Sequence, residues 1–208
     1  FNPSAAPRPE YLICYQCGFI LRLYQRSPEK QLTFGGTEAG RKAVSRLVSK
    51  EKSLRKLPVS SRRQLTKQLF GGLMTQLRSV PIGLRVDDWI RDTYPELCDL
   101  QEDAARRQID ENEQAAAPKV QKMMPEKICN ANLGINAAFA DYWAGILEEP
   151  PLRTPYRAAG CIRIGQKLRK IWKDIPSTPD HDIELVDRWA EELDVTGWYT
   201  WIPREDSD

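Results

Sequence analysis

Residues 125–147 read PEKICNANLGINAAFADYWAGIL, and this stretch decides the fold class. Its apolar side chains recur three and four positions apart, which predicts a helix with a broad apolar stripe. The stripe consists of Ile128, Ala131, Ile135, Ala138, Phe139, Tyr142, Trp143 and Ile146. Because many of the residues in this helix are small, a neighbouring helix can approach it closely. We therefore expect it at the centre of a helical bundle.

Helical patterns continue on both sides of this stretch. Residues 11–25 are apolar nearly all round, which predicts a helix buried on most sides and ended by Ser27-Pro28. In the helix over 61–77, leucines recur every fourth residue, and Gly71-Gly72 predicts either close packing or a break. Pro81 predicts a boundary before a further helical segment, 84–93.

We expect an all-α protein, an irregular bundle of about seven helices with an aromatic C-terminal tail. Convincing alternating β patterns are missing, and the tail Trp198-Tyr199-Thr200-Trp201-Ile202 is expected to pack back on the body. Residues 1–208 are expected to form one domain, with a possible subdivision near 118–125. Because the sequence starts at Phe1 rather than at methionine, we interpret it as the C-terminal part of a longer polypeptide.

The composition is that of a globular protein that does not enter a membrane. Hydrophobic residues make up 41% of the 208 residues and charged residues 29%, which argues against bulk disorder. No run approaches the roughly 18 apolar residues that a membrane span needs. Five cysteines, most of them within apolar helical patterns, favour reduced, buried thiols and a cytoplasmic location.

The charges are distributed unevenly along the chain, although the net charge is only +2. Residues 1–85 carry 16 Lys and Arg against 4 Asp and Glu, whereas residues 86–114 carry 3 against 10. Such sorting predicts a basic face that meets something acidic. The basic face could contact a nucleic acid, an acidic partner, or the acidic segment 86–113 of the same chain.

The densest basic stretch is residues 41–67, and it is the strongest functional signal in the sequence. Two basic helices with a basic connector could follow a phosphate backbone, and scarce aromatic residues favour a duplex over a single strand. The candidate binding residues are Arg41, Lys42, Arg46, Lys50, Arg55, Lys56, Arg62, Arg63 and Lys67, and Lys52 lies among them.

A second candidate site is a polar pocket where the Gly71-Gly72 helix, the Trp89 helix and residues 130–136 would meet. A buried Arg85 or Arg78 paired with Asp87 or Asp88 is our hypothesis for the first two elements. The third element, residues 130–136, carries asparagines, and buried amides need hydrogen-bond partners. The asparagines either line the pocket or bond to neighbouring loops. The candidate residues are Arg78, Arg85, Asp87, Asp88, Asn130, Asn132 and Asn136.

The remaining motifs have simpler structural interpretations. Cys14 and Cys17 have the spacing of half a zinc site, but no second pair follows, so two thiols on a buried helix explain them. His181 is the only histidine, and its neighbours Asp180 and Asp182 suit the positive end of the following helix. We therefore expect no catalytic residue, no metal and no cofactor within these residues.

Three functions fit these observations. The first is a non-catalytic interaction or regulatory domain, whose partner is another protein or another domain of the same polypeptide. The second is the helical part of a hydrolase resembling a metallopeptidase, with its metal-binding segment before Phe1. The third is a nucleic-acid-binding module that uses residues 41–67.

Overall fold

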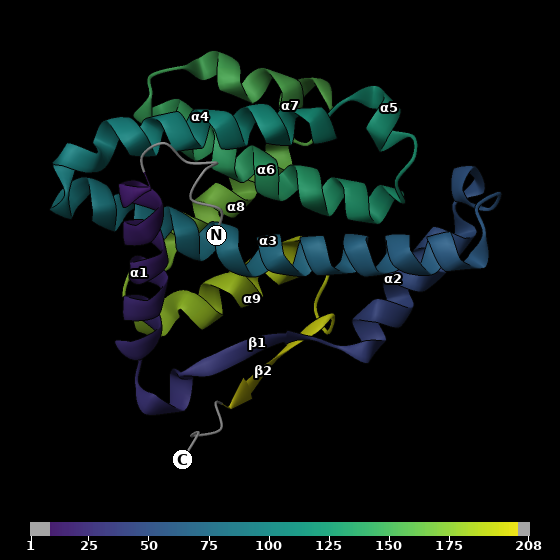
Figure 1. The fold of residues 1–208 in the computed structure, drawn as a ribbon, viewed down its shortest axis with the longest axis horizontal. Helices are drawn as coiled ribbons and strands as arrows, with labels where there is room; N and C mark the ends of the chain where they lie inside the picture. The colour runs from purple at the N-terminus through teal and green to yellow at the C-terminus, as the bar shows by residue number, and fades with distance from the viewer. Residues whose placement is uncertain (1–8, 204–208) are drawn as a thin grey trace.

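The computed structural model describes residues 9–203, and these form nine α-helices and one small sheet of two strands (Figure 1). The all-α prediction is confirmed. The helices are α1 Glu10–Tyr24, α2 Glu38–Lys50, α3 Val59–Thr93, α4 Cys98–Ala115, α5 Pro118–Gln121, α6 Glu126–Ile146, α7 Thr154–Ala158, α8 Ile162–Asp174 and α9 Asp182–Glu192. The strands are β1 Leu32–Gly36 and β2 Tyr199–Pro203.

Helix α6 lies at the centre of the bundle, as its small and apolar residues predict. Trp143, Ile135 and Ala138 are fully buried. Helix α8 packs directly against α6, because Gly165 presents no side chain to Ala137 and Ala138. A Cβ added at Gly165 would lie 2.6 Å from the Cβ of Ala137, so the small residues at this crossing bring the two helices together.

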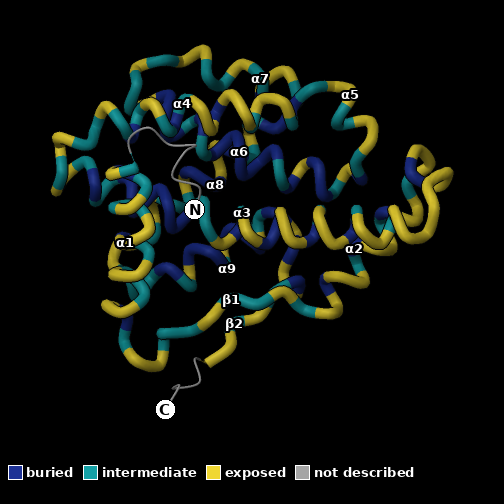
Figure 2. The backbone as a smooth tube through the Cα atoms, viewed as in Figure 1, coloured by how far each residue is buried: buried dark blue, intermediate teal, exposed yellow. Residues whose placement is uncertain are grey.

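Helix α3 is a single helix of 35 residues, and the predicted boundary at Pro81 is wrong. Its N-terminal half is exposed along one side, whereas Pro81 to Asp87 are all buried (Figure 2). Proline has no N–H to donate to the Leu77 carbonyl oxygen, so the helix loses one hydrogen bond. The indole of Trp172 on α8 donates to the Pro81 carbonyl oxygen at 3.0 Å and connects α8 to this segment. Packing on all sides of this segment therefore overrides the local cost of the proline.

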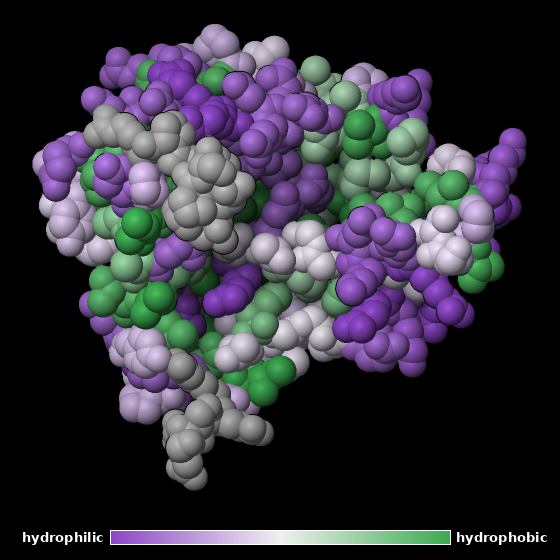
Figure 3. Space-filling model, in the orientation of Figure 1, coloured by the Kyte–Doolittle hydropathy of each residue, from purple (hydrophilic) through white to green (hydrophobic). Residues whose placement is uncertain are grey.

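Helix α1 crosses the buried half of α3, and two glycines allow the close contact. A Cβ at Gly18 would lie 2.4 Å from Val86, and one at Gly83 would lie 2.1 Å from the Tyr15 hydroxyl. The outer side of α1 remains open, with Ile13 and Ile20 both more than half exposed. The expectation that this helix is buried on most sides is therefore wrong: α1 lies on the surface (Figure 3).

The aromatic tail packs back on the body by forming β2, which pairs antiparallel with β1. Phe34 lies opposite Trp201 in this register, and its ring stacks on Tyr199 with centroids 4.7 Å apart. The Asp187 carboxylate on α9 accepts hydrogen bonds from both Tyr199 and Trp201. The sequence of β1 shows no alternating pattern that would predict a strand, because two of its five residues are glycines.

Within residues 9–203, no helix is long and apolar enough to cross a membrane.

Candidate functional site

Helix α2, its connector and the first turns of α3 form a helical hairpin, which we call the basic hairpin (residues 38–67). Helix α2 begins where the Thr37 side chain accepts a hydrogen bond from the Gly40 amide at 3.0 Å. The short connector contains a 3₁₀ turn, Lys52–Leu54, and α2 then packs against α3. The connector lies at one end of the molecule, with hydrophilic side chains gathered over α2 (Figures 1 and 3).

The predicted cations of the basic hairpin are accessible to solvent. Only Arg62 is half-buried, and the other nine, Lys52 included, are exposed. Arg41 lies 3.8 Å from Glu38 in an exposed pair of the same helix, and this is the one ion pair of these cations within the described residues. An exposed pair of this kind contributes little binding energy of its own, so the positive charge of the hairpin stays available.

The acidic segment 86–113 does not neutralise this surface. Its ion pairs within the described part of the chain are Arg91 with Glu102 and Arg106 with Glu149, and neither reaches the basic hairpin. The intramolecular alternative therefore finds no support in the ion pairs of the structure.

Neutral hydrogen-bonding side chains fill the surface between the cations. Seven serine and glutamine residues of the basic hairpin and the adjoining turn of α3 are exposed: Ser45, Ser49, Ser53, Ser60, Ser61, Gln64 and Gln68. Residues 38–67 contain two carboxylates, Glu38 and Glu51, and no aromatic residue. Most of the exposed side chains here can therefore donate hydrogen bonds to phosphate oxygens, and the exceptions are Glu38, Ala39, Leu57, Pro58 and Val59.

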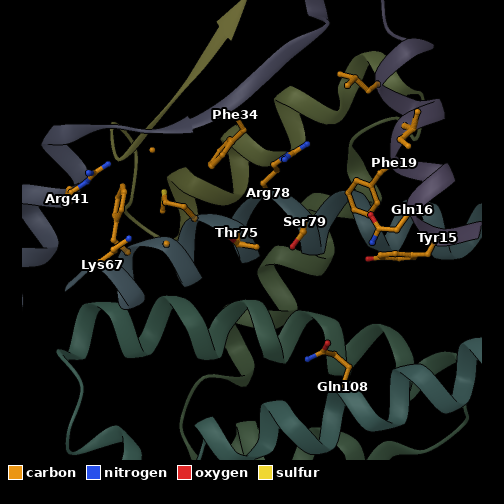
Figure 4. A pocket seen from close by; sticks show the side chains of 16 residues that line it. Tyr15, Gln16, Phe19, Phe34, Arg41, Lys67, Thr75, Arg78, Ser79 and Gln108 are labelled. Carbon is orange, nitrogen blue, oxygen red and sulfur yellow. The ribbon is translucent and has the colours of Figure 1, made fainter. Parts of the chain in front are cut away.

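A groove of about 910 Å³ begins at the base of the basic hairpin and follows the exposed side of α3 toward α1 (Figure 4). Lys67, Gly71, Thr75 and Arg78 lie three or four residues apart, so they form one face of α3 and line the groove. The other walls come from α1, β1 and α2, with Gln108 of α4 at the far edge. The principal wall residues are Gln16, Phe19, Phe34 and Arg41.

The groove contains cations at two places. Arg41 and Lys67 lie together near the basic hairpin, whereas Arg78 lies farther along, between Phe34 and Phe19 (Figure 4). Lys67 and Arg78 have no ion pair or hydrogen bond to another described side chain. Partial burial, together with the charge of Arg26, lowers the pKa of Arg78. The middle of the groove is therefore electropositive.

The predicted pairing of Arg85 with Asp87 or Asp88 does not form, because Arg85 pairs with Asp182 of α9. Arg85 and Asp87 are two residues apart on α3 and so project in nearly opposite directions. Asp182 is fully buried and accepts hydrogen bonds from Arg22, Arg26 and Arg85. Asp182 therefore connects three arginines, in addition to lying at the positive end of α9.

The neighbouring carboxylates Asp87 and Asp88 of α3 have separate surroundings. Asp87 is buried and accepts hydrogen bonds from Tyr11 and Gln101, both 2.9 Å long. Burial is the main cause that raises the pKa of Asp87, to about 7. Asp88 accepts from the hydroxyl of Tyr142, and burial raises its pKa as well.

The asparagines of α6 do not join these groups in one pocket. Asn132 donates to Gln76 at 2.6 Å, and Gln76 donates to Asn136 at 3.4 Å, so the amides link α6 to α3. Asn130 is exposed and lies near the Cys161 thiol. The structure thus distributes the predicted pocket residues over separate places, and of them only Arg78 lines the large groove.

The cysteines and the histidine form no shared centre. All five cysteines have free thiols, and Cys17 is exposed on α1. His181 contacts the Thr178 hydroxyl at 2.7 Å. Within residues 9–203, no three His, Cys, Asp or Glu side chains gather as a metal site would require.

Sequence reasoning missed most of the groove, since its walls come from segments far apart in the chain. The one signal was Gly71-Gly72, but a Cβ at either glycine would meet nothing within 4 Å, and α3 continues through both. Neither close packing nor a break explains them. Comparison of the chain with models of known protein families, with curated proteins and with solved structures finds no match in any of the three.

Proposed function

We propose that this chain is a non-catalytic binding domain that attaches to duplex nucleic acid through its basic hairpin. The observation that carries the proposal is the make-up of the basic hairpin and the adjoining turn of α3: ten cations, nine of them exposed, two carboxylates and seven exposed neutral donors. Lysine, arginine, serine and glutamine are the side chains that contact phosphate oxygens in protein–nucleic acid complexes.

Two features favour a duplex over other acidic partners. Protein interfaces usually contain an apolar or aromatic core. The hairpin exposes only two large hydrophobic residues, Leu57 and Val59, on either side of Pro58 near its tip. Single strands are usually held by stacking on aromatic rings, and residues 38–67 contain none. The proposed mode is therefore contact with the phosphate backbone, with little preference for base sequence.

Binding of a fluorescent duplex at increasing salt concentration tests the proposal. We expect binding at about 50 mM salt that weakens steeply toward about 200 mM, because each neutralised phosphate releases counterions. The double variant Arg46→Gln/Lys50→Gln removes two exposed cations of α2, and it is expected to reduce the slope of log Kd against log salt by about 2.

The matched control is Arg163→Gln/Lys170→Gln, which removes two exposed cations from α8. It should bind the duplex as the unmodified protein does. Equal loss in the two double variants, or no binding at about 50 mM salt, would refute the proposal. Tighter binding of a polyglutamate peptide than of the duplex would also refute it, in favour of an acidic protein partner.

A further inference from the structure

The groove along α3 has the size of a small-molecule site. Its volume of about 910 Å³ lies within the range of sites that enclose a drug-sized ligand, roughly 300–1,000 Å³. Lys67 and Arg78, eleven residues apart on one helix face, span about 16 Å along the groove floor. A ligand that fills the groove is therefore elongated.

Apolar side chains line the groove on both sides of Arg78 (Figure 4). Phe70 and Met74 of α3 and Phe34 of β1 contribute apolar side chains to the groove, and Phe19, Ile20 and Leu23 extend the apolar lining along α1. Such a lining removes apolar ligand surface from water, which is the main source of affinity in small-molecule sites.

Arg78 supplies the group that would bind an anion. Ser79 follows it on α3, and Gln16 lies on α1, so two further hydrogen-bonding side chains line this part of the groove (Figure 4). The neighbouring arginine cluster adds to the positive potential, because Arg22, Arg26 and Arg85 share the single carboxylate Asp182. An anionic group of a ligand has a favourable position here.

Gly71 provides an independent argument. A glycine within a helix costs about 1 kcal/mol of stability relative to alanine. Close packing does not offset this cost at Gly71 or Gly72, because no atom lies within 4 Å of a Cβ placed at either position. Gly71 lines the groove and Gly72 does not. Because a Cβ at position 71 has no neighbour within 4 Å, a larger side chain there would project into the groove, so glycine at this position keeps the floor open.

From these observations we propose that the groove binds a small organic anion, with its carboxylate or phosphate at Arg78 and its elongated apolar body over Gly71. This site is separate from the nucleic-acid surface of the basic hairpin. Fatty acids and nucleotides share the required chemistry, an anionic group on an apolar or aromatic body.

Titration with the fluorescent aromatic sulfonate 8-anilinonaphthalene-1-sulfonate tests the site directly. Gly71→Leu fills the groove and is expected to weaken binding about tenfold or more, and Arg78→Gln is expected to weaken it about tenfold. Gly72→Leu is the matched control, because it adds the same side chain to the same helix outside the groove. Its affinity should stay within about twofold of the unmodified protein.

Competition distinguishes the two sources of the ligand. Displacement of the dye by dodecanoate indicates an acyl chain, and displacement by AMP indicates a planar base. Equal affinity in all four proteins, or displacement by neither competitor, would overturn the proposal. Displacement by inorganic phosphate as effective as by the organic anions would also overturn it, since an ion site alone needs no groove. Duplex binding by the basic hairpin is measured separately, so either proposal can fail without the other.

Discussion

Arg85 and Asp182 form a buried ion pair across 97 residues of sequence, with Nη1 of the arginine 2.9 Å from Oδ1 of the aspartate. The same carboxylate accepts hydrogen bonds from Arg22 at 2.7 Å and from Arg26 at 3.1 Å. One aspartate at the start of α9 therefore connects α3 with α1 and the residues that follow it. This connection fixes the wall that α1 contributes to the groove.

Replacement of Asp182 by asparagine should destabilise the fold strongly. The change keeps the size of the side chain but leaves three guanidinium groups near one another without a compensating charge. Breaking a buried ion pair by removing one partner typically costs about 3–5 kcal/mol, and we expect a loss of that size in the free energy of unfolding in urea. Asp194→Asn is a suitable control, because its pair with Lys127 is exposed and should contribute less than about 1 kcal/mol. Similar small losses in both variants would contradict this role of Asp182.

The sequence predicts the helical class, the central position of α6 and the accessible cations, because these depend on local periodicity and charge. It does not predict that Asp182 pairs with three arginines, since a partner 97 residues away leaves no local pattern in the sequence. The helix boundary predicted at Pro81 is wrong for a related reason. A proline destabilises a helix locally, but the burial of this segment on several sides offsets that loss. The groove depends on how α1 and β1 lie across α3, and no single segment contains that information.

The stability of the fold should depend on the ionisation of Asp87. Burial raises the pKa of this carboxyl to about 7 in the folded protein, whereas an aspartate in the unfolded chain has a pKa of about 3.9. The folded state therefore holds a proton that the unfolded state has lost, and stability falls as pH rises between these two values. Its contribution is fully present below about pH 4 and is lost above about pH 7.

Asp87→Asn isolates this effect, because asparagine has no ionisation and still accepts a hydrogen bond from Tyr11. Relative to the unmodified protein, the variant should gain a few kcal/mol in the free energy of unfolding between about pH 4.5 and pH 7.5. Urea unfolding at several pH values measures the difference. A constant difference across this range would contradict the raised pKa.

Gly72 of α3 and Gly18 of α1 should respond to alanine with opposite signs. Gly72→Ala adds a methyl group where no atom lies within 4 Å, so it should raise the free energy of unfolding by about 0.5–1 kcal/mol through helix propensity alone. Gly18→Ala places a Cβ 2.4 Å from the branched side chain of Val86, and overpacking of this kind costs about 1–3 kcal/mol. Thermal unfolding followed by circular dichroism compares the two variants. A stabilising Gly18→Ala would show that the contact between α1 and α3 can widen without cost.

Asp187 should control whether the aromatic tail remains attached to the body. Its carboxylate accepts hydrogen bonds from the Tyr199 hydroxyl at 2.6 Å and from the Trp201 indole at 2.9 Å, and both rings contact Phe34 of the groove wall. Asp187→Ala removes both bonds and should lower the free energy of unfolding by about 1–3 kcal/mol, since each bond involves a charged acceptor. Asp187→Asn keeps one oxygen acceptor and should lose less. The near-ultraviolet circular dichroism of the aromatic cluster should weaken in the same order, while the helical signal stays constant. If the alanine variant retains the full aromatic signal, then the strand pairing of β1 and β2 alone holds the tail in place.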